Sequence, residues 1–130
     1  MLRGIQCFDT GQGVNYDVVA EYNQKLVKIQ VKTTEKQRLI HDHANPIYFF
    51  HLKRFGKSGK KNYELTDFDC YALVALDIRQ VFYLKFDDKI PQNSICIRDR
   101  KIKYIGKATG GKLNGLYYQD LTWENLCQKL

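Results

Sequence analysis

The chain has 130 residues, a length typical of one domain, and its 44% hydrophobic and 27% charged residues are an ordinary globular composition. The net charge of +7 favours a polyanionic partner such as nucleic acid, although a soluble protein of another function can carry the same charge. No apolar run is long enough for a membrane span, the N-terminus lacks a signal peptide's apolar stretch, and four cysteines without a CxxC pair argue against a zinc ribbon or a disulfide framework. We expect an intracellular protein, cytoplasmic or nucleoid-associated, of cellular, organellar or viral origin.

The first half of the chain predicts short strands separated by turns. The predicted strands are 4–8, 16–22, 26–33 and 47–50. The second and third of them should form a β-hairpin around Asn23. Residues 53–64 are rich in lysine and glycine, which is typical of an exposed loop.

The second half predicts a buried pair of strands. Residues 71–76 form a continuous apolar run, which suits a strand covered on both faces, and 81–86 should pair with it across a turn. Residues 94–98 predict one more strand, and Thr122 predicts the cap of a short C-terminal helix. These elements indicate a sheet-dominated α/β domain that spans residues 1–130.

Two basic stretches are candidates for phosphate contact. They contain Lys53, Arg54, Lys57, Lys60 and Lys61 in the first, and Arg98, Arg100 and Lys101 in the second. Beside the first, Phe55 and Tyr63 could stack on bases or wedge between them. Flexible, solvated loops are the alternative interpretation, and the polar face of the hairpin favours DNA contact.

The predicted hairpin has an apolar face and a polar face. Burying both apolar sets on one side fixes which residues of the two strands can stand opposite each other. A two-residue turn at Asn23 and Gln24 places Asp17 opposite Gln30, and a four-residue turn places it opposite Lys32. With either turn, Asp17, Gln30 and Lys32 project from the same face as neighbours.

This cluster contains the groups that metal-dependent phosphodiester hydrolysis requires. The Asp17 carboxylate, the Gln30 amide oxygen and the Val31 carbonyl are the hard oxygen ligands that Mg²⁺ prefers. Lys32 could orient or deprotonate an attacking water, or stabilise charge that builds on the phosphate. Taken from the pattern alone, a solvated hairpin face with an ordinary salt bridge is the stronger interpretation.

The same residues resemble a known signature. Asp17 followed by Gln30-Val31-Lys32 resembles the D-x(n)-(D/E)-x-K motif of PD-(D/E)XK nucleases. The segments YDVV (16–19), KIQVKT (28–33), DFDCYALV (67–74) and VFYL (81–84) resemble the group I intron-associated homing endonucleases of that superfamily. The resemblance covers roughly residues 14–90, the bulk of the core.

The resemblance implies a restriction-endonuclease-like core, with a central mixed β-sheet flanked by few helices. It implies an endonuclease that depends on Mg²⁺ or Mn²⁺ and hydrolyses phosphodiester bonds of double-stranded DNA. Asp17, Gln30 and Lys32 would be catalytic, and Asp17, Gln30 and Val31 would hold the metal. Cutting both strands with one site per chain implies a homodimer or homotetramer.

Two departures from the family pattern define the alternative. Gln30 stands where the superfamily usually has an acid, although the homing branch accepts glutamine. The N-terminal helix, which often supplies a further Glu, is expected to be missing, because Met1 falls just before the first predicted strand. A catalytically impaired DNA-binding module with the same fold is therefore the alternative, and a structural or partner-binding protein is a third possibility.

The remaining candidate residues have structural interpretations. His41 and His43, with His51, predict a polar loop rather than a metal cluster. Asp67 and Asp69 could aid a second metal, but they more often act as a turn or cap before a strand. Core positions are predicted for Cys70, Tyr71, Cys96 and Trp123.

Overall fold

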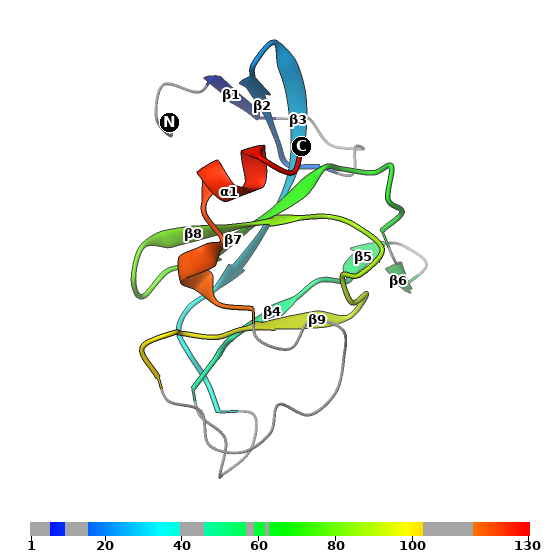
Figure 1. Cartoon of the computed structure of the whole chain (residues 1–130). Coiled ribbons are helices and arrows are strands. Elements are labelled where there is room, and N and C mark those ends of the chain that lie inside the picture. The colour runs from blue at the N-terminus through cyan, green and yellow to red at the C-terminus, as the bar shows by residue number, and fades with distance from the viewer. Residues whose placement is uncertain (1–5, 10–15, 40–45, 57–58, 62, 103–115) are drawn as a thin grey trace.

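The central element is a five-stranded mixed sheet with the strand order β1-β2-β3-β7-β8 (Figure 1). Its strands are β1 (Gln6–Asp9), β2 (Val18–Tyr22), β3 (Lys25–Thr34), β7 (Cys70–Ala75) and β8 (Gln80–Lys85). The β3–β7 pair is parallel and the other neighbours are antiparallel. The computed structural model describes residues 6–9, 16–39, 46–56, 59–61, 63–102 and 116–130. The mixed sheet with few helices confirms the expected fold class.

The β2–β3 hairpin closes through the shorter of the two turns considered. Asn23 and Gln24 have φ values of 48° and 63°, the pair of positive angles that a type I′ turn requires. Val18 is paired with Ile29 and Tyr22 with Lys25. The turn is thus the two-residue one, but the paired register ends at Val18, and the Asp17 N–H bonds to the carbonyl of Ile29 and not to that of Gln30.

The sheet is covered on both faces, so that the molecule has three layers. On one face lies α1 (Trp123–Cys127), whose Trp123 and Leu126 pack on Ala20 and Ile29. The predicted cap is confirmed, because the Thr122 hydroxyl accepts a hydrogen bond of 3.2 Å from the backbone N–H of Asn125. A short 3₁₀ helix, η1 (Tyr118–Asp120), precedes it. Among the described residues, no helix is both long and apolar enough to cross a membrane.

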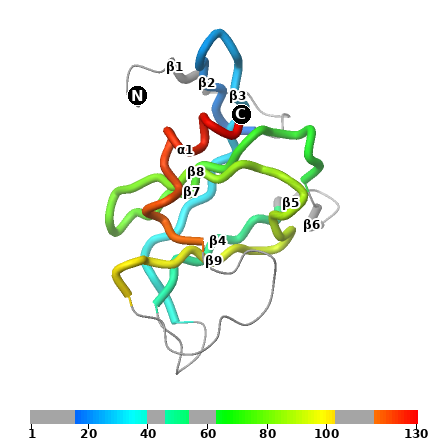
Figure 2. Tube along the Cα trace, viewed as in Figure 1, coloured from blue at the N-terminus to red at the C-terminus, as the bar shows by residue number. Residues whose placement is uncertain are grey.

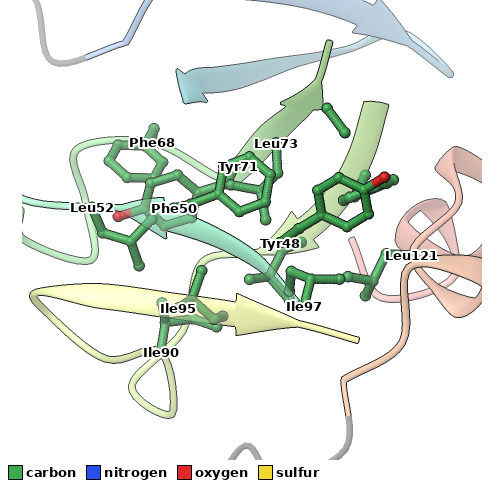
Figure 3. Close-up of a cluster of buried hydrophobic side chains, with 13 residues drawn as sticks. Tyr48, Phe50, Leu52, Phe68, Tyr71, Leu73, Ile90, Ile95, Ile97 and Leu121 are labelled. Atoms are coloured by element: carbon green, nitrogen blue, oxygen red, sulfur yellow. The ribbon is translucent and has the colours of Figure 1, made fainter. Parts of the chain in front are cut away.

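The other face is covered by a two-stranded ribbon of β4 (Tyr48–His51) and β9 (Ser94–Ile97). Phe50 and Ile97 point from the ribbon towards Leu73, and this layer holds the larger hydrophobic core (Figure 3). Cys70 and Trp123 are buried as predicted, on the α1 side. The prediction that Cys96 is buried is wrong: it is half-buried, because its neighbours Ile95 and Ile97 occupy the inward positions of β9.

The predicted loop at 53–64 is wrong over 54–56 and 59–61, which form a second small hairpin. β5 (Arg54–Gly56) and β6 (Gly59–Lys61) are antiparallel, with Gly56 opposite Gly59 at the turn end. The density of lysine and glycine suggested a loop, but the two short strands pair with each other through their backbones. Figure 2 shows the same arrangement as a tube, with β4 and β9 side by side.

Candidate active site

Asp17 lies at the start of β2, where the strand separates from β3. Its N–H donates to the carbonyl of Ile29 at 2.9 Å, which holds the backbone against β3. Its carboxylate Oδ2 accepts two hydrogen bonds, from Gln30 Nε2 at 2.9 Å and from the Val31 N–H at 3.0 Å. The structure therefore brings the carboxylate directly onto the Gln30-Val31 segment.

The Val31 carbonyl points to the same side as Asp17. In a β-strand the N–H and C=O of one residue face the same neighbour. The Val31 N–H reaches the Asp17 side chain, whereas the Lys28 carbonyl accepts from Asp69 on the β7 side. The last residue of β2 to pair with β3 is Val18, opposite Ile29. The Val31 carbonyl is therefore directed beyond the end of β2, beside the Asp17 carboxylate.

Gln30 is the buried member of the cluster, with 8% of its surface exposed, while Asp17 is exposed. In the parallel pair, Gln30 lies beside Tyr71, whose ring belongs to the core between the sheet and the β4–β9 ribbon. Its amide is thus held from two sides, by that core and by Asp17. Buried polar groups keep a hydrogen-bond partner, and Asp17 is the partner of the Gln30 amide.

Lys32 completes the cluster near the C-terminal end of β3. Its Nζ lies 3.2 Å from the hydroxyl of Tyr63 and 5.1 Å from the centre of that ring. Burial lowers the pKa of Lys32 from its ordinary value, and the nearby Asp17 carboxylate partly opposes this shift. Asp17, Gln30 and Lys32 are thus neighbours on one face, as the alternation of the hairpin predicts; the catalytic role of each stays a prediction.

Tyr63 is the residue whose place in the site the sequence did not reveal. It was expected beside a base, and its hydroxyl instead meets Lys32, 31 positions earlier in the chain. Lys32 and Tyr63 come together through the pairing of β3 with β7, which follows Tyr63 in the chain. Residue spacing within a single strand or helix cannot predict such a contact.

The two basic stretches occupy different places relative to the cluster. Lys53 is half-buried after β4, and Arg54, Lys60 and Lys61 lie on the β5–β6 hairpin. Lys57 lies outside the described residues. Tyr63 follows Lys61 by two positions, which places the end of β6 within about 7 Å of a residue that touches Lys32. The end of the first stretch is therefore close to the residue that contacts Lys32.

The second stretch lies at the opposite edge of the sheet. Lys101 lines a hollow with Arg79 and Gln80 at β8. Going from β2 to β8 crosses three strand spacings, about 14 Å. Arg100 forms a salt bridge with Asp120, and the backbone of Arg98 is bridged to Tyr117. The structure does not bring this stretch together with Asp17.

Asp67 and Asp69 have the structural roles that were favoured for them. Asp67 Oδ2 accepts from the Glu64 N–H at 2.7 Å, and its own N–H donates to the Glu64 carbonyl at 2.9 Å, which closes a turn. Asp69 Oδ2 accepts from the Lys28 N–H at 2.8 Å and continues the β3–β7 ladder by one contact. His51 lies exposed at the end of β4, and His41 and His43 lie outside the described residues.

The atoms at the cluster fit a hard divalent cation, with one rearrangement. Within the described ranges, no three His, Cys, Asp or Glu side chains could hold a metal ion together. The donor set at the cluster is one carboxylate, one amide and one carbonyl, all oxygen ligands of the kind that Mg²⁺ accepts alongside water. Gln30 now turns Nε2 towards Asp17, so a shared cation requires its amide to rotate and present Oε1.

No protein-family model and no curated protein sequence matches the chain. Among solved structures, it is similar to a bacterial homing endonuclease, I-Ssp6803I, with a TM-score of 0.52 and 16% sequence identity, over 75% of this chain and 67% of that one. An identity this low shows a shared fold, here an α/β endonuclease-like core with a mixed sheet and few helices.

Proposed function

We propose that this chain is a metal-dependent endonuclease of the PD-(D/E)XK type that hydrolyses phosphodiester bonds in double-stranded DNA. The observation that carries the proposal is the convergence of the Asp17 carboxylate, the Gln30 amide and the Lys32 ammonium at one end of the β2–β3 hairpin. The shared fold with a homing endonuclease supports it. A net charge of +7 suits a DNA substrate.

Asp17, Gln30 and the Val31 carbonyl would hold Mg²⁺ or Mn²⁺. A divalent cation held there supplies charge for the scissile phosphate and acidifies the attacking water. The hydrogen bond from the Val31 N–H fixes Asp17 Oδ2, and among the described residues no donor contacts Oδ1. Oδ1 is therefore the oxygen of Asp17 that is available to a ligand.

Lys32 would act on the water or on the phosphate. Its Nζ is half-buried on the same face as Asp17, so it can hold or deprotonate the nucleophile, or stabilise the charge that develops on the phosphate oxygens. A lysine in a partly desolvated position suits either role, because burial weakens its hold on its proton and strengthens its electrostatic effect.

The β5–β6 hairpin would hold the DNA backbone beside this cluster. Lys53, Arg54, Lys60 and Lys61 belong to the basic stretch that precedes Tyr63 in the chain, and phosphate contacts by such residues set position and affinity. Arg98, Arg100 and Lys101 would contact the duplex further away. We further propose a homodimer or homotetramer, since each chain offers one such cluster and a double-strand break needs two.

The test is nicking and linearisation of a supercoiled plasmid with Mg²⁺ by the native chain, Asp17→Asn, Lys32→Ala and Glu21→Gln. Glu21 is the matched control, an exposed acid on the same hairpin at its turn end. We expect Asp17→Asn and Lys32→Ala to lose at least about 100-fold in rate and Glu21→Gln to keep the native rate. Equal nicking by all four proteins would identify a contaminating nuclease and contradict the proposal.

A DNA-binding module without cleavage is the second candidate, and one observation favours it. Because position 30 is a glutamine, Asp17 is the one carboxylate in the described cluster. The Gln30 amide turns its N–H donor, and not its oxygen, towards that carboxylate. Salt-sensitive duplex binding by the native chain, with no cleavage in Mg²⁺ or Mn²⁺, would establish this candidate in place of the nuclease.

A further inference from the structure

Tyr63 contacts Lys32 through its oxygen. Lys32 Nζ lies 3.2 Å from the hydroxyl, while the ring centre is 5.1 Å away. An ammonium group only donates hydrogen bonds, so the hydroxyl oxygen is the acceptor. The contact is therefore a directed hydrogen bond as well as a cation–ring contact.

The phenol ring of Tyr63 is held by the core. It meets the ring of Phe68 edge-on, with centroids 4.9 Å apart and planes at 83°. Phe68 is 1% exposed and stacks on Phe86 with a centroid distance of 4.2 Å. The side chain of Tyr63 is thus held by packing against the core, and its hydroxyl has a fixed position.

Lys32 needs such a contact more than Asp17 or Gln30 does. Asp17 and Gln30 hydrogen-bond each other, and Asp17 is fixed again by Val31. The ammonium of Lys32, by contrast, stands on a flexible four-carbon stem. The Tyr63 hydroxyl, on the segment that leads into β7, accepts a directed hydrogen bond from Lys32, whereas Asp17 acts on Lys32 through its charge.

We infer that Tyr63 is a positioning residue, whose hydroxyl holds the Lys32 ammonium in the orientation that phosphodiester cleavage needs. This inference rests on the proposed nuclease function. Because Tyr63 follows the β5–β6 hairpin directly, the same contact ties the lysine to the basic hairpin next to it. Tyr63 is thus assigned to the protein's own lysine and not to stacking on a base.

The experiment compares the native chain with Tyr63→Phe and with the matched control Tyr118→Phe. Both variants remove one hydroxyl from a tyrosine that packs against the same core, but Tyr118 stacks on Phe82 beside β8. NMR of protein with ¹³C-labelled lysine measures the order of the Lys32 Cε group at constant pH, and Lys32→Arg identifies its signal. Single-turnover cleavage and duplex affinity are measured on the same proteins.

We expect Tyr63→Phe to make the Lys32 head group mobile and to slow single-turnover cleavage about 10-fold, with unchanged duplex affinity and melting temperature. Tyr118→Phe should leave both readouts at native values. An ordered Lys32 in Tyr63→Phe overturns the inference, and so does a mobile Lys32 with native cleavage. If the native chain cuts no duplex, the nuclease proposal fails and the inferred catalytic role falls with it, while the NMR comparison still shows separately whether Tyr63 holds the lysine.

Discussion

Gln30 is the residue that sets the charge of the cluster. Its neutral amide donates to Asp17 at 2.9 Å, so the two side chains attract each other without a metal. A glutamate at this position would place two carboxylates at that separation, and like charges so close cannot both ionise without a cost that a divalent cation removes. The amide therefore favours the protein without metal, and in the proposed metal site it would be a weaker ligand than a glutamate carboxylate.

Gln30→Glu should separate these two effects. We expect the melting temperature without metal to fall by about 5 °C, because a buried hydrogen bond is replaced by a repulsive pair. Mg²⁺ should then raise the melting temperature of Gln30→Glu far more than that of the native chain, since a second anionic oxygen strengthens the site. Thermal unfolding without Mg²⁺, and then at Mg²⁺ concentrations that increase in 10-fold steps, measures both changes.

The matched control is Gln30→Leu, which removes the hydrogen bond and adds no charge. It should lower the melting temperature to a similar extent but gain nothing from Mg²⁺. If Gln30→Glu and Gln30→Leu respond to Mg²⁺ alike, position 30 does not contribute to a metal site.

Within the candidate site, only the residues of the β2–β3 hairpin could be placed from the sequence. Alternation along 16–22 and 26–33 fixes which side chains share a face, so the neighbourhood of Asp17, Gln30 and Lys32 follows from local pattern. The contact between Lys32 and Tyr63 does not, because it depends on a parallel strand pair that closes far along the chain.

At the scale of elements, the β2–β3 turn sets the register in which the two strands of the hairpin pair. Asn23 and Gln24 both adopt positive φ, which asparagine tolerates and glutamine disfavours. The sequence Asn-Gly is the preferred solution for this turn. The hairpin therefore holds its register with one residue that is not optimal for the turn.

Gln24→Gly should raise the free energy of unfolding by about 0.5 kcal/mol, because glycine adopts φ near 63° without a steric penalty. Gln24→Ala, which keeps the Cβ atom, should give no such gain. Urea denaturation of the three proteins measures the difference. A gain that is equal for glycine and alanine would mean that the turn conformation is not the cause.

Strands were predicted well where apolar residues mark them and poorly where they do not. Residues 71–76 and 81–86 match β7 and β8 because buried strands need continuous or alternating apolar side chains. β5 and β6 have basic residues and glycine in three-residue strands, so their pairing depends on backbone hydrogen bonds that leave no pattern in the sequence.

At the scale of the whole molecule, the parallel β3–β7 pair lies at the centre of the sheet. Its residue Cys70 makes the free energy of unfolding depend on pH. Cys70 is fully buried at the start of β7, and burial raises its pKa from the ordinary value of 9.0 to about 12. The folded state therefore keeps the thiol neutral at pH values where the unfolded chain ionises it. This contribution to stability is complete below about pH 9 and is lost as the pH rises towards 12.

Between pH 8 and pH 10.5, we expect the free energy of unfolding to fall, with about 2 kcal/mol of the decrease due to Cys70. Burial also raises the pKa of Tyr48 and Tyr71, which lowers stability in the same direction at higher pH. Cys70→Ala should show a smaller decrease over this interval. Urea unfolding at the two pH values, on native and variant protein, measures it; equal decreases would show that Cys70 does not titrate as expected.

The sequence separations of the two halves of the cluster set the order in which they can form during folding. Asp17 and Gln30 are 13 positions apart within one hairpin, whereas Lys32 and Tyr63 are separated by 31. Short loops close sooner and at lower entropic cost than long ones. The contact between Asp17 and Gln30 can thus form while the downstream half of the chain is still unfolded, whereas Lys32 gains its partner only once the chain as far as Tyr63 has folded against β3. For the proposed nuclease, the carboxylate that would hold the cation would therefore be in place before the lysine that would act on the phosphate.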